Sequence, residues 1–287
     1  MHPWLLEHPP ISTYGTCIVL ALVVAWLWAR FRARAAGVDS SRIDLLMPVL
    51  MGAGLLGAWG FGKFTDALTG ELANGTVLVG ALLTATAAGI GYALLCRIRL
   101  GILADICAAP LALGIGIGRV GCFFAGCCYG SVCAVPVRPA WLTGVRFPAG
   151  SLAYVHQVRV GELVVEGTNS SRQAGSYIGV QSSLPVYPVQ LYESALCVLL
   201  AVVIWRWRVR DERGVTGQKF LAMGLGYAGI RFGLEFLRAD NPPVGGLTFS
   251  QWGAILIAVL ALTTWILRCR HATAWGLRRG QPTSIPG

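Results

Sequence analysis

The sequence has few charged residues for its length. Only 13% of its 287 residues are Asp, Glu, Lys or Arg, while 55% are hydrophobic. A soluble domain of this size carries more charge on its surface, so the composition excludes an ordinary soluble protein. The mean hydropathy of +0.63 agrees with this exclusion. We therefore expect an all-α integral membrane protein that crosses the bilayer several times.

The sequence also lacks a basic stripe for nucleic-acid binding and a cysteine framework for disulfide bonds. The net charge of +10 comes from arginines in short clusters between apolar runs, with no basic stripe of interleaved aromatic residues, so no nucleic-acid partner is expected. The nine cysteines follow no framework spacing, which argues against a disulfide scaffold.

Seven apolar segments are present, and the sequence predicts a transmembrane helix for each. Four contain no charged residue: Ile11–Ala29, Leu45–Gly62, Leu72–Cys96 and Asn241–Leu267. The other three contain charges: Asp105 in Leu100–Gly118, Glu193 in Val189–Trp205, and Arg231 with Glu235 in Phe220–Phe236. Residues 1–287 are expected to form a single membrane domain.

The basic residues predict the orientation of these spans. Fifteen of the twenty-three lysines and arginines fall on one side if the chain runs with its N-terminus outside and its C-terminus in the cytoplasm. No lysine or arginine precedes the first apolar run, and Arg30, Arg32 and Arg34 follow it, so the first span is predicted to be uncleaved.

The longest connection between predicted spans, residues 131–186, then lies outside the cytoplasm, between spans four and five. It is rich in Val, Gly, Ser and Pro, with several aromatic and basic residues. Alternating stretches such as Val158–Val165 predict a small β-containing head.

Charged side chains from several spans are predicted to share one level near the outer leaflet. Arg119 ends span four, Glu193 begins span five, Arg231 and Glu235 lie in the outer half of span six, and Tyr14 opens span one. Arg231 and Glu235 are four residues apart on one helix face and can pair. Guanidinium groups at this depth suit a phospholipid phosphate. Asp105, by contrast, is expected to cap the start of span four and to lie outside the site.

Three motifs and an opening Tyr-Gly resemble those of the prolipoprotein diacylglyceryl transferase family, in the same order along the chain. Arg-x-Gly-x-Phe-x-x-Gly-x-x-x-Gly runs from Arg119 through Gly121 and Gly126 to Gly130. Pro-x-Gln-Leu-Tyr-Glu occupies positions 188–193, Arg-Phe-x-x-Glu-Phe-x-Arg occupies positions 231–238, and Tyr14-Gly15 opens span one.

The resemblance implies transfer of the diacylglyceryl group from phosphatidylglycerol to a prolipoprotein cysteine, in a bacterial cytoplasmic membrane and at a site open to the outer leaflet. Arg119, Arg231, Glu235 and Tyr14 are the expected catalytic residues. The expected substrate-binding residues are Arg119, Gly121, Gly126, Gly130, Glu193 and Arg238. No cofactor and no metal is expected.

The sequence departs from the family pattern at four positions. Val79 and Tyr187 stand where histidines are usual, Cys122 stands for an asparagine and Cys127 for a glutamate. His156, in the predicted head, is the one histidine away from the chain ends. The residues that would hold phosphate are kept, whereas much of the acid–base complement is replaced.

We call the motif from Arg119 to Gly130 the signature segment. Its cysteines admit three interpretations. Cys122, Cys127 and Cys128 could pack among glycines, could supply a reactive thiolate near Arg119, or could bind a metal together with Cys133. A disulfide within the group is also possible in an oxidising compartment.

Two alternatives to the transferase remain open at this point. A paralogue could keep the phospholipid site but use its own cysteine for another acceptor or for thiol redox chemistry. A lipid-binding membrane protein without catalysis is the second alternative.

Overall fold

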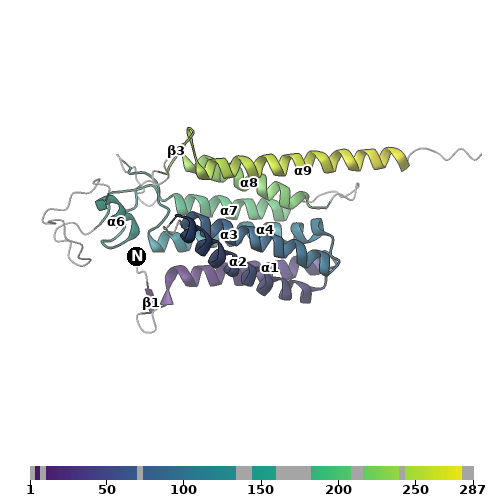
Figure 1. Cartoon of the computed structure of the whole chain (residues 1–287), viewed down its shortest axis with the longest axis horizontal. Coiled ribbons are helices and arrows are strands. Elements are labelled where there is room, and N and C mark those ends of the chain that lie inside the picture. Colours follow the sequence, from purple (N-terminus) through teal and green to yellow (C-terminus); the bar gives the residue numbers. More distant parts are fainter. Residues whose placement is uncertain are drawn as a thin grey trace, which may run out of the picture. The chain divides into compact units, whose positions relative to one another are not determined.

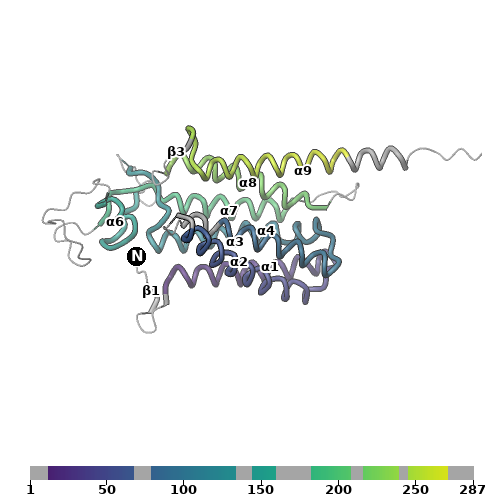
Figure 2. Tube along the Cα trace, in the orientation of Figure 1, coloured from purple at the N-terminus to yellow at the C-terminus, as the bar shows by residue number. Residues whose placement is uncertain are grey.

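The computed structural model describes residues 4–6, 11–69, 74–133, 144–159, 182–207, 216–238 and 243–279. Long helices dominate this part of the chain (Figures 1 and 2). They are α1 (Thr13–Ala35), α2 (Ser40–Thr69), α3 (Asn74–Leu95), α4 (Leu100–Ala125), α7 (Val189–Arg206), α8 (Gln218–Glu235) and α9 (Phe249–Arg279). A short helix, α6 (Leu152–Arg159), and two antiparallel strand pairs complete the described elements: β1 (Trp4–Leu6) with β2 (Ile11–Ser12), and β3 (Pro243–Val244) with β4 (Leu247–Thr248).

Each of the seven predicted spans coincides with one of the long helices. Within the described residues, five helices are long and apolar enough to cross a membrane: α1, α2, α4, α7 and α9. The protein is therefore a helical membrane protein. The shorter apolar stretch Val79–Leu95 lies in α3.

Several helices extend beyond the predicted spans, and two of the differences affect the charged segments. The fourth span was expected to end at Gly118, but α4 continues for two more turns to Ala125 and thus contains Arg119 and Cys122. The last span was expected to begin at Asn241, yet α9 begins only at Phe249, after the β3–β4 hairpin. Gly245 and Gly246 form the turn of this hairpin at φ values of 64° and 86°, which a helix cannot accommodate.

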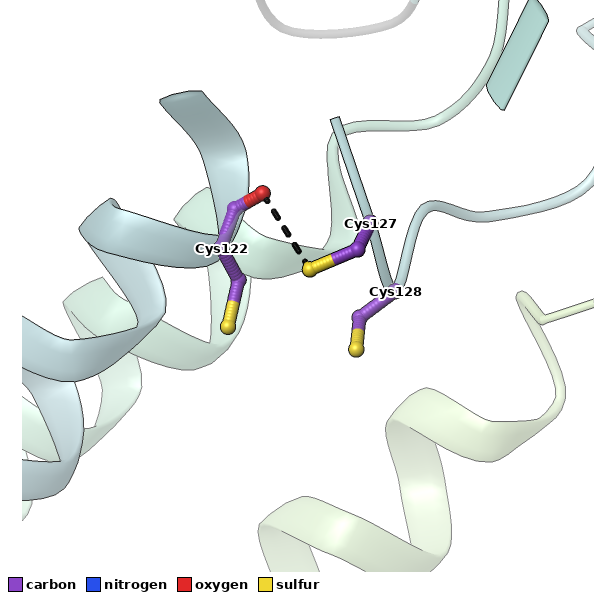
Figure 3. A group of neighbouring side chains, drawn as sticks. All are labelled: Cys122, Cys127 and Cys128. Carbon is purple, nitrogen blue, oxygen red and sulfur yellow. Dashed lines mark hydrogen bonds between the residues drawn. The ribbon is translucent and has the colours of Figure 1, made fainter. Parts of the chain in front are cut away.

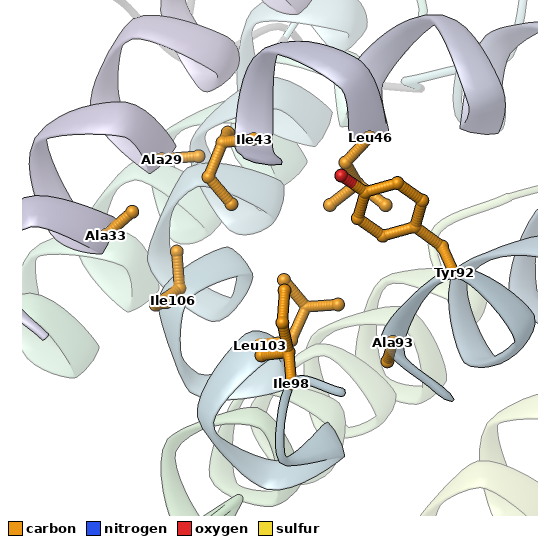
Figure 4. Packing of buried hydrophobic residues seen from close by; sticks show 9 residues of the cluster. All are labelled: Ala29, Ala33, Ile43, Leu46, Tyr92, Ala93, Ile98, Leu103 and Ile106. Carbon is orange, nitrogen blue, oxygen red and sulfur yellow. The ribbon is translucent and has the colours of Figure 1, made fainter. Parts of the chain in front are cut away.

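The chain folds into two compact units. The first comprises Met1–Val23, Leu111–Trp207 and Leu221–Ile266, and the second comprises Val24–Pro110, Arg208–Phe220 and Leu267–Gly287. In the second unit, buried residues of α1 to α4 and of the turn between α3 and α4 form one apolar cluster (Figure 4). Its larger side chains are those of Ile43, Leu46, Tyr92, Ile98, Leu103 and Ile106. The Tyr92 hydroxyl donates a hydrogen bond to the Arg42 carbonyl at 2.6 Å, which satisfies its polar end.

Small residues let α2 and α3 approach closely. A Cβ atom on Gly57 would collide with Thr84 and with the Gly80 carbonyl oxygen, and one on Gly80 would lie 2.6 Å from the Gly57 carbonyl oxygen. Such close backbone approach is how helices associate in lipid, where no hydrophobic force drives them together. Gly57 and Gly80 therefore act as packing residues between these two helices.

Asp105 has a different role from the predicted one. Its carboxylate accepts hydrogen bonds from the backbone N–H groups of Gly217 at 2.6 Å and Phe220 at 3.1 Å. Gly217 directly precedes α8 and Phe220 lies in its first turn, where the N–H groups have no partner within the helix. Asp105 therefore caps α8, and the prediction that it caps the start of its own helix was wrong.

The first unit contains the described part of the predicted head. Isolated bridges join Val132 and Val145 to Val186, and Pro148 to Ser182. Tyr129, Phe147, Ala153 and the bridged Val186 form a buried cluster. The prediction of a strand at Val158–Val165 was wrong for its first two residues, because they belong to α6. The other residues of that stretch lie outside the described part of the chain.

Candidate functional site

A buried carboxylate joins two arginines of the first unit. Glu193, near the start of α7, is only 1% exposed. Its Oε2 lies 3.0 Å from Arg119 Nε of α4 and 3.8 Å from Arg231 Nη1 of α8. A buried charge is tolerated when it is paired and hydrogen-bonded, and both conditions hold here because Glu193 Oε1 also accepts the Tyr227 hydroxyl at 3.1 Å. The predicted convergence of Arg119, Glu193 and Arg231 is confirmed.

A second carboxylate extends this network along α8. Arg231 Nη2 lies 3.2 Å from Glu235 Oε2, which confirms the predicted pairing across one helical turn. Arg238 Nε lies 3.9 Å from the same Glu235 oxygen. Arg231, Glu235 and Arg238 thus form a line from α8 into the segment that follows it, and Glu193 links this line to Arg119.

Three polar residues that sequence reasoning missed hold these charges in place. Tyr227 lies one turn before Arg231 on the same face of α8, a spacing that could have identified it. Ser250 Oγ accepts a hydrogen bond from Arg231 Nη2 at 2.9 Å. The Thr248 hydroxyl donates to Glu235 Oε1 at 2.8 Å.

Thr248 also begins α9 through a reciprocal cap. The Gln251 N–H donates to Thr248 Oγ1 at 3.3 Å, and the Thr248 N–H donates to Gln251 Oε1 at 2.9 Å. Thr-x-x-Gln is the sequence signature of a capping box, and it stands here at positions 248–251. The cap therefore fixes the hydroxyl that binds Glu235.

One guanidinium nitrogen in the network is left without a hydrogen bond. Arg231 Nη1 is buried and has no hydrogen-bond partner among the described residues, since its 3.8 Å separation from Glu193 Oε2 is too long for one. An unpaired buried donor costs free energy unless a ligand or water meets it. Arg231 thus has one donor in place for an anionic ligand.

Tyr14 and Gly121 lie together where α1 meets the end of α4. A Cβ atom on Gly121 would lie 2.9 Å from Cys17 Cβ and 3.3 Å from the Tyr14 ring. The missing side chain at position 121 therefore brings Tyr14 next to the signature segment. Tyr14 itself is 44% exposed, so its ring is accessible from outside the protein.

The other two signature glycines shape the backbone after α4. Gly126 has a φ of +67°, a conformation that side chains rarely adopt, and it ends the helix. Gly130 packs so tightly that a Cβ atom would lie 2.7 Å from Leu237 O, Tyr187 Cβ and Val189 Cγ2. These contacts explain the three glycines by packing and turn geometry. Whether any of them also contacts substrate stays a prediction.

The signature cysteines gather at the C-terminal end of α4 (Figure 3). The sulfur atoms of Cys122, Cys127 and Cys128 all lie within 4.8 Å of one another, and all three side chains are half-buried. Cys133 is buried and is not part of this group, so the four-cysteine set considered for a metal site is wrong in that member. Cys122, Cys127 and Cys128 are not joined by a disulfide in this structure.

The pKa values of Cys127 and Cys128 are shifted in opposite directions. The pKa of Cys128 is lowered, first by interaction with the neighbouring side chains of Cys122 and Cys127, and then by the positive charges of Arg238 and Arg119. The pKa of Cys127 is raised, mainly by its hydrogen bonds with the other two thiols and by burial. Among the three cysteines, the thiolate form is therefore favoured at Cys128 over Cys127.

The positions that depart from the family pattern lie on different elements. Tyr187 precedes α7, and contact with Cys133 raises the pKa of its hydroxyl. Val79 belongs to α3, in the second unit. His156 lies on α6, with its ring 6.1 Å from that of Tyr129, and its buried Nδ1 has no hydrogen-bond partner among the described residues.

The charge balance of the network suits an anion. Three guanidinium groups, from Arg119, Arg231 and Arg238, face two carboxylates, from Glu193 and Glu235, which leaves one positive charge in excess. A phosphodiester carries one negative charge and presents oxygens that match the guanidinium fork. The arrangement can hold such a group and favour added negative charge on it.

Comparison with known proteins connects this site to one family. A sequence model described as prolipoprotein diacylglyceryl transferase matches residues 3–267. The relative named phosphatidylglycerol–prolipoprotein diacylglyceryl transferase 2 from Clostridium perfringens is 27% identical over 268 residues, covering 87% of this chain and 88% of the relative. Phosphatidylglycerol–prolipoprotein diacylglyceryl transferases from Geobacter sulfurreducens and Xanthomonas euvesicatoria are 27% and 29% identical, covering 93% and 84% of this chain and 94% and 79% of the relatives. Since the match extends over nearly the whole sequence, the chain belongs to the prolipoprotein diacylglyceryl transferase family.

Proposed function

We propose that this protein transfers the diacylglyceryl group of phosphatidylglycerol to the cysteine thiol of a prolipoprotein, a step of lipoprotein biosynthesis. Family membership and the relatives' names support this activity over the cysteine-dependent paralogue and the non-catalytic lipid binder. The observation that carries the proposal is the buried network in which Glu193 joins Arg119 to Arg231.

In this reaction the acceptor sulfur forms a bond to the terminal glycerol carbon of the diacylglyceryl group. The bond between that carbon and its phosphate oxygen breaks, and glycerol phosphate leaves with the electron pair. The phosphodiester carries one negative charge, whereas the leaving phosphate monoester carries nearly two. Attraction to the arginines therefore grows as the bond breaks, which lowers the activation barrier rather than only binding the lipid.

Each residue of the network has a proposed role. Arg231 and Arg119 hold the phosphate, and Nη1 of Arg231, which has no hydrogen-bond partner among the described residues, supplies a donor for one of its oxygens. Glu193 and Glu235 orient these guanidinium groups, Arg238 adds positive charge, and Tyr14 lines the opening of the site. Gly121, Gly126 and Gly130 let the signature segment approach the lipid.

We place the reaction at the outer leaflet of the bacterial cytoplasmic membrane. Seven spans with the N-terminus outside and the C-terminus inside form a single membrane domain, and residues 131–186 form a head outside the cytoplasm. The arginine distribution supports this orientation, and the helices at all seven predicted spans support the count.

The proposal is tested with purified protein in phosphatidylglycerol nanodiscs and a peptide that carries a lipobox cysteine. Wild type is expected to add the mass of diacylglyceryl to the peptide. Arg231→Ala is expected to lower the rate on the order of 10²-fold or more, because a donor to the developing charge is lost. Arg206→Ala is the matched control, since Arg206 is exposed at the other end of α7. No mass gain with wild type, or full activity of Arg231→Ala, would refute the proposal.

A further inference from the structure

The proposed reaction needs a group that removes the proton of the acceptor thiol. Thiolates, not thiols, are the nucleophiles in such reactions. The two carboxylates nearest the phosphate site are already engaged: Glu193 by Arg119 and Tyr227, and Glu235 by Arg231 and Thr248. The cysteine group at the end of α4, which the phosphate-holding network does not use, lies beside these residues.

This group has the composition and spacing of a three-sulfur metal site. Tetrahedral zinc with Zn–S bonds of about 2.3 Å separates its sulfur ligands by about 3.8 Å. The sulfur atoms of Cys122, Cys127 and Cys128 already lie within 4.8 Å of one another, so small side-chain rotations bring them to that spacing. Three sulfurs leave the fourth position of the tetrahedron open, which distinguishes a catalytic zinc site from a structural one.

The backbone around the group is fixed by contacts of its own. Gln190, 1% exposed at the start of α7, donates a hydrogen bond from Nε2 to the Cys127 carbonyl at 2.7 Å. The Cys127 N–H bonds to the Cys122 carbonyl at 3.1 Å, and the Ala153 N–H bonds to the Gly126 carbonyl at 3.1 Å. The cysteine sulfurs are thus brought together by the fold itself, as a preorganised site requires.

Cys128 adopts an unusual backbone conformation. Its φ is +60°, which is unfavourable for a residue with a Cβ atom and is adopted at little cost by glycine. Strain of this kind is concentrated at functional sites. In this conformation the Cys128 sulfur lies within 4.8 Å of those of Cys122 and Cys127 (Figure 3).

We propose that Cys122, Cys127 and Cys128 bind a zinc ion whose open fourth position takes the acceptor cysteine of the prolipoprotein as a thiolate. This inference rests on the proposed transferase function and assigns its missing deprotonation step. A thiol that coordinates zinc is deprotonated outright, so its proton passes to water and then to the released phosphate monoester. The bound sulfur attacks the glycerol carbon, the carbon–oxygen bond breaks, and the neutral thioether leaves the zinc. The positive charges of Arg119 and Arg238 offset the negative charge of the sulfur ligands.

The first test measures the metal without any reaction. Wild type prepared with a reducing agent and loaded with Zn²⁺ or Co²⁺ is expected to keep one ion per chain through gel filtration, by elemental analysis. Cys122→Ser, Cys127→Ser and Cys128→Ser are each expected to lose that ion, whereas the half-buried Cys269→Ser of α9 keeps it. Wild type that holds no more metal than the serine variants, that selects Cu⁺ over Zn²⁺, or that holds the three sulfurs as a disulfide would overturn the inference.

The second test detects the acceptor thiol at the metal. The visible spectrum of the Co²⁺-loaded wild type, without phosphatidylglycerol, is expected to change when the lipobox peptide is added. A peptide with serine in place of that cysteine is expected to leave the spectrum unchanged. This readout uses only wild-type protein, so it does not depend on the folding of any variant. Equal spectra with the two peptides would overturn the inference.

The third test separates this inference from the transferase function. Removal of zinc with a chelator is expected to lower peptide alkylation about 10²-fold, near the lower limit of what proton-transfer catalysis contributes, and added zinc restores it. Full alkylation by metal-free protein would overturn the zinc site and leave the transferase standing. A cysteine-dependent Co²⁺ spectrum without alkylation by any form would instead refute the transferase function.

Discussion

Arg231 is the residue on which the phosphate site depends most. It contacts both buried carboxylates and Ser250, and one of its nitrogens is left for a ligand. A guanidinium group can do all of this at once because its donors form a planar fork, which the single ammonium of lysine lacks. The charge alone is therefore not sufficient at this position.

We expect Arg231→Lys to lose nearly as much transferase activity as Arg231→Ala. The positive charge remains, but the contacts to Glu193, Glu235 and substrate cannot form together, so kcat/KM is predicted to fall on the order of 10²-fold. Arg206→Lys serves as the control, with unchanged kinetics in the nanodisc assay. A lysine variant within about twofold of wild type, a difference of only about 0.4 kcal/mol, would show that charge alone suffices.

The unequal pKa shifts of the neighbouring cysteines predict different pH dependences. The pKa of Cys128 is lowered, so its thiolate persists as the pH falls, whereas the raised pKa of Cys127 keeps that thiol protonated. In metal-free protein, alkylation of Cys128 by iodoacetamide should therefore fall less than that of Cys127 when the pH is lowered from about 9 to about 7, across the ordinary thiol pKa of about 8.5. Mass spectrometry of peptides from digested protein measures the alkylation of each cysteine. Parallel losses of reactivity at Cys128 and Cys127 would contradict the predicted difference between them.

At the scale of elements, helix ends position the site. The capping box that starts α9 fixes the Thr248 hydroxyl against Glu235, and Ser250 in the same turn contacts Arg231. The end of α4, by contrast, is set by Gly126 in its left-handed conformation. Both ends lie in the first unit, with the charged residues of α7 and α8.

Thr248→Val tests the role of the α9 cap. It removes the hydroxyl that both caps the helix and binds Glu235, so we expect a loss of about 1 kcal/mol in stability and a fall in kcat. Thr264→Val is the matched control, because the Thr264 hydroxyl only bonds to the Leu260 carbonyl within the same helix. Thermal unfolding in detergent and the peptide assay measure the two effects. Equal thermal stability and equal kcat of the two variants would show that the Thr248 hydroxyl does not position the site.

How far the sequence predicts the structure differs between elements. Apolar length identified all seven long helices, and helical spacing predicted the Arg231–Glu235 pair. Helix ends were less predictable, because α4 stays apolar beyond Arg119 and because the residues before Phe249 are uncharged although they form a hairpin. The partners of Asp105 and Thr248 could not be predicted at all, since they depend on tertiary contacts between segments far apart in the sequence.

For the whole molecule, the central prediction is its orientation in the membrane. Alkaline phosphatase is active only outside the cytoplasm, so truncations fused to it report the side of each junction. Fusions after Cys133 are expected to be active and fusions after Trp207 inactive, because four predicted spans precede the first junction and five precede the second. The reverse pattern would place the charged site at the cytoplasmic leaflet.

The most direct test of the proposed transferase reaction measures both of its products together. Phosphatidylglycerol labelled in its headgroup glycerol is supplied with the lipobox peptide, and released glycerol phosphate and alkylated peptide are counted together. We predict one labelled glycerol phosphate for each diacylglyceryl-peptide formed, with both products lost in Arg231→Ala and kept in Arg206→Ala. Peptide modification without glycerol phosphate, or equal rates in the two variants, would contradict a transferase that works through the Arg119–Glu193–Arg231 network.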